Sequence, residues 1–446
     1  RLVGVVLNVS SVVLMYLIVK EVFKREDTAL IASFLTAINP LLVFFSHNVQ
    51  LMNVGLFFML LSLYIYLRWV ETNRDRYLVV AALFLALAGL TKYPFLVILA
   101  PMAALFPFER AKKIKRNYAP YVISLIILLS IPLWMHYSSS TVTSRYNADV
   151  SASISLIKPE VLLEPAFWKI TESYLKDNFT MIGVAFSVLG FLFFLSSFNK
   201  RDIKQRFFWG YLVGFLVFVF IMSFKMQGHN YHYFPIAPFF IILMAYAFTR
   251  ISDLAGNLKI EGKRIRHINT LVSVLLIMVL ILPSQSAIAR MFDTQFFGLD
   301  VAGDYIRTHK ERGDIVIHSS HQAYGVLWAG DIFGTNGIPK DLDNFRFAED
   351  EWNASWLFIY NWDFNILQDD RYKELWGYIS SNYRLVQFGF IQRGDQPATP
   401  TYMLFRKGGS FDKNRMNEML SDKQIRYKDY ELTGGIVRFS YITLEE

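Results

Sequence analysis

Long apolar runs alternate with short polar connections over residues 1–286 of the chain. A helix that crosses a bilayer needs about 20 mostly apolar residues, and each run reaches or approaches that length. The pattern therefore predicts ten membrane spans. The fourth and fifth runs are short and are separated by residues 91–94, where a proline predicts a break. The runs lie at about residues 2–19, 28–46, 53–69, 77–91, 94–107, 118–137, 181–198, 207–224, 233–249 and 268–284.

From residue 287 onward the pattern becomes that of a soluble α/β domain. Amphipathic helical spacing at 299–310 is followed by a turn and a buried strand at 313–317. Alternation of helix and strand predicts a small, partly parallel sheet. The fold class is thus an α-helical multi-pass membrane protein over 1–286, with a C-terminal soluble α/β domain over 287–446. Further strands are expected at 356–360, 384–390 and 401–405, with a helix at 371–381.

Composition and charge support a membrane protein and refine its partners. The chain is 54% hydrophobic with a mean hydropathy of +0.31, which is too apolar for a soluble protein of 446 residues. Residues 287–446 hold 18 Lys and Arg against 23 Asp and Glu, so the first part holds 27 against 14. The positive charge therefore belongs to the membrane half. It indicates topology and contact with lipid phosphate, and no nucleic-acid partner is expected.

Basic residues mark alternate connections between the apolar runs and set the predicted sidedness. The positive-inside rule places these connections in the cytoplasm. The other connections and the domain at 287–446 then face outward, which predicts a multi-pass protein of the cell membrane with an extracytoplasmic C-terminal domain. The chain contains no cysteine, which we take to favour a prokaryotic source. The basic connections lie at residues 20–25, 68–76, 110–116, 200–206 and 259–266.

A polar segment at 225–235 is the first candidate for chemistry. It brings Lys225, His229, His232 and Tyr233 together between two apolar runs on the predicted outer face. One interpretation is an aromatic belt with a snorkelling lysine. Another is a site for a lipid-linked phosphate, in which lysine supplies charge and histidine and tyrosine donate hydrogen bonds. The pattern places no carboxylate beside the two histidines, so no metal site is assigned, and a divalent cation stays an open candidate cofactor.

Further candidates lie on the same predicted face. Lys92 and Tyr93 stand at the break between the fourth and fifth runs, where Lys92 either snorkels or contributes to the phosphate site. The outer loop at 138–180 carries Asp149 and Glu164, which are weak candidates for a catalytic base. Solvated loop charges are the simpler interpretation of both. The tripeptide beginning at Asn178 matches the N-glycosylation pattern, which arises often by chance.

Three stretches carry a family resemblance. Residues 46–58, with His47, Gln50 and Asn53, are similar to an outer turn that ends in Phe-Phe. Residues 88–94 are similar to a Gly-Leu-x-x-Leu-Thr-Lys turn, and residues 232–238 to a His-Tyr-x-x-Pro-x-x-Pro segment. Over residues 1–285 the chain resembles the lipid-dependent GT-C glycosyltransferases of the protein O-mannosyltransferase and ArnT type. It departs from them at the outer turn, where an Asp is usual near Met52 and an Arg at His47.

The resemblance implies an inverting transfer of a sugar from a polyprenyl-phosphate carrier to a protein, lipid or glycan acceptor on the outer face. Basic and polar residues would hold the carrier phosphate, and a carboxylate in the first outer loop would activate the acceptor. That loop is expected upstream of Arg1, because the chain begins inside an apolar run. The outer-turn candidates are His47, Gln50 and Asn53. The expected phosphate-binding residues are Lys92, Tyr93, Lys225, His229, His232 and Tyr233.

Two other classes of function remain open. A transporter or flippase of a lipid-linked saccharide would favour ionisable residues and helix breaks near the bilayer midplane, in two related halves. Here the polar residues crowd one face instead. A non-catalytic GT-C-like scaffold that presents the C-terminal domain is compatible with Met52 in place of an acidic residue.

Overall fold

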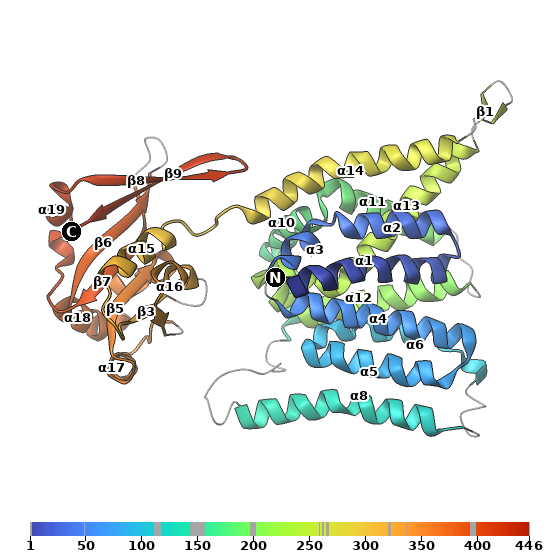
Figure 1. Ribbon diagram of the computed structural model, residues 1–446, viewed down its shortest axis with the longest axis horizontal. Helices are drawn as coiled ribbons and strands as arrows, with labels where there is room; N and C mark the ends of the chain where they lie inside the picture. The colour runs from blue at the N-terminus through green and yellow to red at the C-terminus, as the bar shows by residue number, and fades with distance from the viewer. Residues whose placement is uncertain are drawn as a thin grey trace. The chain divides into compact units, whose positions relative to one another are not determined.

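The computed structural model describes residues 2–445 except 49, 111–116, 143–156, 197–201, 258, 261–262, 265–266, 320–322, 336 and 393–397. The chain divides into two compact units, Arg1–Phe292 and Asp293–Glu446 (Figure 1). The last helix of the first unit, α14, continues past residue 286 to Phe292. Each unit contains its own hydrophobic clusters.

The first unit is a bundle of apolar helices, because its sequence offers no alternation of period two from which a sheet would form. Large side chains such as Trp69, Phe95 and Phe208 fill its interior. A two-stranded ribbon, β1 (Lys259–Ile260) with β2 (Lys263–Arg264), precedes the last helix. The helices are α1 (Leu2–Phe23), α2 (Glu26–Ala37), α3 (Pro40–Ser46), α4 (Leu51–Thr72), α5 (Asp75–Thr91), η1 (Tyr93–Ile98), α6 (Leu99–Leu105), η2 (Phe108–Arg110), α8 (Ala119–Tyr137), η3 (Ser138–Val142), η5 (Pro159–Leu163), α10 (Pro165–Phe179), α11 (Met181–Ser196), α12 (Ile203–Gly228), η6 (Asn230–Ile236), α13 (Ala237–Gly256) and α14 (Ile268–Phe292).

All ten predicted apolar runs contain helix, but they are not ten equal spans. Among the described residues, six helices are long and apolar enough to cross a membrane, and two bent pairs raise the number to at most eight. The pairs are α2 with α3, bent by 52°, and α10 with α11, bent by 96°. The predicted break between the fourth and fifth runs is present, since α5 ends at Thr91 and a 3-10 turn begins at Tyr93.

Small residues allow several helices to approach backbone to backbone. On α11, a Cβ atom added at Gly190 would lie 2.0 Å from the carbonyl oxygen of Leu243 on α13. On α12, a Cβ added at Gly210 would lie 2.6 Å from Cα of Pro101. Packing between apolar helices in lipid depends on such close contacts, because there is little hydrophobic drive to associate. At the edge of the bundle α8 packs along α5 (Figure 1).

The second unit is a seven-stranded mixed sheet with helices on both faces. The strand order is β4-β3-β5-β7-β6-β9-β8, in which β3 is parallel to β4 and β5 and all other pairs are antiparallel. Its elements are α15 (Leu299–His309), β3 (Ile315–His318), α16 (Tyr324–Gly330), β4 (Phe333–Gly334), α17 (Leu342–Glu351), β5 (Ala354–Tyr360), η8 (Asn361–Leu367), η9 (Asp370–Tyr372), α18 (Lys373–Asn382), β6 (Tyr383–Ile391), β7 (Thr399–Lys407), η10 (Lys413–Arg415), α19 (Met416–Ser421), β8 (Ile425–Leu432) and β9 (Gly435–Thr443).

Alternating side chains of the central strands divide the core of this unit into two layers. Leu357 on β5, opposite Phe405 on β7, belongs to the cluster on the α17 and α18 face. The neighbouring Phe358, opposite Leu404, belongs to the cluster on the α15 face. The predicted partly parallel sheet is thus present. It is extended by the C-terminal hairpin of β8 and β9, which the apolar pattern did not predict.

The contact at Gly190 provides a test of the bundle packing. We expect Gly190→Ala to destabilise the membrane unit by about 1–3 kcal/mol, because the added methyl group meets a main-chain carbonyl that cannot rotate away. The control is Gly256→Ala on α13, where the added atom would meet only Asn269, at 3.4 Å. Thermal unfolding of both purified variants in detergent measures the difference. Equal melting temperatures would contradict this helix contact.

Candidate functional site

A break in the helical bundle positions Lys92. Helix α5 ends at Thr91, Lys92 has an extended backbone, and Pro94 lies in the first turn of η1. Proline has no N–H and clashes with the carbonyl four residues earlier, so α5 cannot continue through it. The side chain of Lys92 therefore leaves the helix axis and lies over the ring of Tyr231, with Nζ 4.6 Å from the ring centroid.

Lys225 supplies a second ammonium group to the same place. It lies in the last turn of α12, and its Nζ donates a hydrogen bond of 2.9 Å to Oη of Tyr93. Within the described part of the chain, neither Lys92 nor Lys225 forms an ion pair with a carboxylate. Burial, together with the nearby charge of Lys225, lowers the pKa of Lys92 to about 8. An anion bound between the two lysines would relieve this repulsion.

The 3-10 turn η6 forms the aromatic wall of the site. His229 and Tyr231 stack with ring centroids 4.9 Å apart, and the rings of Tyr231 and His232 are 4.5 Å apart. His232 is buried, and the charges of Lys92 and Lys225 act on it. A neutral histidine ring carries one N–H donor and one acceptor nitrogen, so both rings can take part in hydrogen bonds. The break and the polar segment, far apart in sequence, therefore form one cluster.

Helix α10 holds η6 in place from the other side. The buried amide of Asn178 donates a 3.2 Å hydrogen bond to the carbonyl oxygen of Asn230. Tyr174 donates to the carbonyl oxygen of Gln227, and its ring meets Tyr233 edge-on at 6.2 Å. Tyr233 thus packs against α10, which gives it a structural contact. Because Asn178 is fully buried and bonded, its tripeptide is not a glycosylation site in this fold.

The outer-turn candidates close the junction between α3 and α4. The side chain of Asn53 is buried and donates a 2.8 Å hydrogen bond to the carbonyl oxygen of Phe45. His47 ends α3, where its ring lies against Phe292 with centroids 5.8 Å apart. Gln50 is the exposed residue that precedes α4. The turn reaches the cluster through Phe45, whose ring lies 6.1 Å from that of Tyr231.

Of the two acidic candidates, Glu164 lies among the described residues. Glu164 is exposed at the start of α10, where its backbone N–H bonds to Val161. Asp149 lies outside the described residues. A different carboxylate, Asp177, is half-buried in the last turn of α10, where the charge of Arg290 acts on it. Sequence reasoning did not single out Asp177, because nothing in the local pattern distinguishes it from the other charges of the 138–180 loop.

No metal centre can be built from the described side chains. Among the residues that the structure describes, no group of three or more His, Asp or Glu side chains gathers closely enough to hold an ion. The cluster is instead made of two lysines, two histidines and tyrosines, which are donors rather than ligands for a hard cation.

An apolar cleft adjoins the lysine cluster. It has a volume of about 390 Å³ and lies between η1 and α6, α8 and α12. Tyr93 belongs to both sites, since its ring lines the cleft while its hydroxyl accepts the hydrogen bond from Lys225. The rest of the lining is apolar, and it includes Pro94, Val97, Val217, Phe218, Ile221 and Met222. A ligand with a charged head and a hydrocarbon tail fits such an arrangement.

A family comparison bears on the first part of this site. Residues 1–136 match the family model described as dolichyl-phosphate-mannose-protein mannosyltransferase. The match includes the outer turn and the break at Lys92, and it ends before Lys225. It confirms the resemblance of the membrane unit to GT-C glycosyltransferases.

Among solved structures, the chain is similar to a single-particle cryo-EM structure of the arabinofuranosyltransferase AftD from mycobacteria. The TM-score is 0.39 and the identity 12%, over 96% of this chain and 36% of that one. The chain therefore spans little more than a third of the length of that protein. No curated protein gives a match.

The hydrogen bond from Asn178 provides a test of how η6 is held. We expect Asn178→Ala to destabilise the membrane unit by about 1–3 kcal/mol, because it leaves the carbonyl oxygen of Asn230 without its donor. Asn117→Ala is the control, since it removes an exposed hydrogen bond to Asp75. Thermal unfolding monitored by tryptophan fluorescence compares the two, and an equal effect would show that the bond does not anchor η6.

Proposed function

We propose that this membrane glycosyltransferase of GT-C type takes its sugar from a polyprenyl-phosphate carrier and transfers it to a protein, lipid or glycan acceptor on the outer membrane face, with inversion. The observation that carries the proposal is the pair Lys92 and Lys225, two cations without a carboxylate partner in the described chain, beside an apolar cleft. The family match supports the reaction class.

The lysine pair suits a phosphodiester better than it suits a neutral ligand. Two like charges in a half-buried place repel each other, and the single negative charge of a phosphodiester bound between them reduces this repulsion. The phosphate monoester that remains after transfer carries up to two negative charges. Lysine acts on phosphate as a point charge, and the rings of His229 and His232 can add hydrogen bonds to its oxygens. These residues would hold the carrier phosphate, and Tyr93 would orient Lys225.

The cleft provides for the hydrocarbon part of the same ligand. Because Tyr93 lines the cleft and contacts Lys225, the cleft begins where the phosphate would end. Burial of isoprene carbons against Val217 and Ile221 would add affinity only for a lipid-linked donor. A free sugar nucleotide has no group that matches this surface.

The contacts also suit the chemical step. When the acceptor oxygen attacks the anomeric carbon, the bond from that carbon to the phosphate oxygen breaks, and the phosphate keeps the electron pair. Its charge grows as the bond breaks, so lysine contacts become stronger in the transition state than in the ground state. Lys92 and Lys225 are placed to stabilise the leaving phosphate. The proton of the acceptor passes to a base, for which the resemblance implies a carboxylate in the first outer loop.

Release of the carrier tests the reaction class directly. We would reconstitute the full-length protein in nanodiscs with a labelled polyprenyl-phosphate sugar and candidate acceptors, then measure free polyprenyl phosphate. Acceptor-dependent release is expected of a transferase. If labelled donor only crossed the bilayer of a proteoliposome, with its glycosidic bond intact, the flippase alternative would replace this proposal.

Removal of either charge should weaken binding of the carrier. We expect Lys92→Gln and Lys225→Gln each to weaken the affinity for undecaprenyl phosphate by about 10- to 100-fold, because each removes a charge-assisted hydrogen bond of about 1.5–3 kcal/mol. Microscale thermophoresis in nanodiscs measures the affinity. Lys169→Gln is the matched control, because Lys169 is an exposed lysine of α10. Affinities equal to that of the control would argue against a phosphate at this site.

A larger side chain in the apolar cleft should weaken binding of the carrier's hydrocarbon tail and leave the phosphate contacts unchanged. We expect Val217→Trp to weaken binding of undecaprenyl phosphate at least 5-fold, because the larger ring occupies space that the tail needs, an overpacking effect of about 1–3 kcal/mol. Leu216→Trp is the control, since Leu216 is the exposed neighbour on α12 that does not line the cleft. The same affinity in both variants would show that the tail lies elsewhere.

A further inference from the structure

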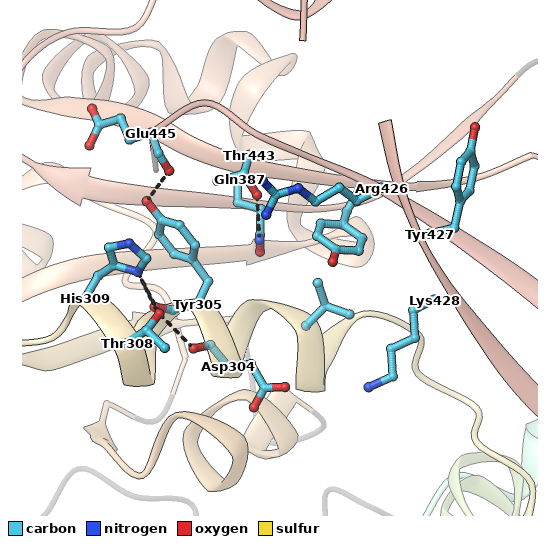
Figure 2. Close-up of a pocket in the computed structure, with 12 residues that line it drawn as sticks. Asp304, Tyr305, Thr308, His309, Gln387, Arg426, Tyr427, Lys428, Thr443 and Glu445 are labelled. Atoms are coloured by element: carbon cyan, nitrogen blue, oxygen red, sulfur yellow. Dashed lines mark hydrogen bonds between the residues drawn. The ribbon is translucent and has the colours of Figure 1, made fainter. Parts of the chain in front are cut away.

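The second unit contains a cleft of its own. It has a volume of about 680 Å³, within the range of about 300–1,000 Å³ that is usual for small-molecule sites. All of its lining residues lie between Val301 and Glu445. Helix α15 forms one side, the β8–β9 hairpin forms the other, and β6 contributes between them (Figure 2).

The sheet topology leaves this space open. Helix α15 packs Val301 and Tyr305 onto the middle of the sheet, in one cluster with Tyr402 and Phe439. Strand β8 lies at the edge of the sheet and pairs with β9 alone. The edge strand therefore extends beyond the part of the sheet that α15 covers, and its alternate side chains Arg426 and Lys428 lie on the cleft side.

Flat aromatic surfaces line the cleft. The rings of Tyr305 and His309 are stacked, with centroids 4.0 Å apart and an interplanar angle of 22°. Tyr441 on β9 lies opposite Arg426 of β8, on the same side of the sheet as Phe439 and α15. Such rings offer rigid apolar faces with a polar edge, which suits a ligand that is apolar on its ring faces and hydroxylated at its rim.

Planar polar groups complete the lining. Figure 2 shows Arg426 extending from β8 toward Gln387 and Thr443, while Asp304 comes from α15 on the opposite side. Gln387 is buried, accepts a 2.6 Å hydrogen bond from Tyr402 and donates one of 3.3 Å to Thr443. Its amide nitrogen carries two hydrogens, so a second donor is available there. Guanidinium, carboxylate and amide groups each present two polar atoms side by side, a spacing that matches adjacent hydroxyls.

The charges of the cleft are balanced, in contrast to the lysine cluster of the membrane unit. Lys428 forms an ion pair of 2.6 Å with Asp300, and Asp304 one of 2.8 Å with Arg307. Glu445 is paired with Arg384 at 2.5 Å. A phosphate would find no excess of cations here, and a cationic ligand no excess of carboxylates. A neutral ligand that both donates and accepts hydrogen bonds fits best.

We propose that the cleft between α15 and the β8–β9 hairpin binds a neutral oligosaccharide, with sugar rings on its tyrosine faces and hydroxyls on Arg426, Asp304 and Gln387. The inference concerns binding, and it holds whether or not the membrane unit transfers sugar. It assigns to the second unit a role of its own in recognising a glycan.

The test uses the full-length protein in nanodiscs on a printed array of linear oligosaccharides. The array carries tetramers to hexamers of mannose, glucose, galactose, N-acetylglucosamine and arabinose, with sulfated and uronic-acid oligomers beside them. We expect binding to at least one neutral series. The best neutral ligand is then titrated by calorimetry, and Arg426→Ala and Tyr441→Ala should each weaken its affinity 10-fold or more.

Matched variants separate this cleft from other surfaces. Arg415→Ala removes an exposed arginine that pairs with Glu418 and does not line the cleft, so its affinity should equal that of the wild type. Lys92→Gln should also bind the glycan normally, which distinguishes this inference from the proposed donor site. Arg426 is exposed and Tyr441 is half-buried, and unchanged melting temperatures would confirm that their variants fold. Binding only of acidic oligomers, no binding, or equal affinity in all variants would overturn the inference.

Discussion

The membrane unit depends on two ammonium groups that lie close together among apolar helices. Lys92 and Lys225 have no carboxylate partner in the described chain, so their repulsion is tolerated by solvent contact, by aromatic rings and by the hydroxyl of Tyr93. Without a bound anion, the repulsion between these two charges lowers the stability of the folded protein. The break at Pro94 directs Lys92 away from its helix, and η6 places the ring of Tyr231 beneath it. Helix α10 in turn holds η6.

The local patterns of the sequence predicted much of this architecture. Apolar runs of span length correctly predicted helices, and Pro94 correctly predicted the break after α5. Both features depend on residues within one helical turn of each other, so a local pattern is enough to predict them. The polar segment containing His229 and His232 was a candidate site because a helix can end at a membrane interface without such a cluster. The contact between this segment and Lys92 depends on how distant helices pack. The sequence indicated only that both lie on the same predicted face of the membrane.

Other features depend on tertiary contacts that no local pattern encodes. The 96° bend between α10 and α11 lies at Thr180, whose φ of 62° is uncommon for a residue with a side chain. That bend brings Tyr174 and Asn178 against η6, so Tyr233 packs on α10 and Asp177 comes to a half-buried place. The hairpin of β8 and β9 was missed because its exposed strand carries charged residues in place of an apolar face.

The position of Tyr93 has a consequence for which carriers the protein would distinguish. Tyr93 accepts a hydrogen bond from Lys225 and also lines the apolar cleft, so a carrier bound as proposed would meet this one residue with both its phosphate and the start of its tail. A cleft of about 390 Å³ can enclose only the first few isoprene units, and the remainder of a long chain must lie among the lipids. Discrimination would then act on the unit next to the phosphate, through its saturation and double-bond geometry. The affinity would then depend little on the total length of the carrier chain.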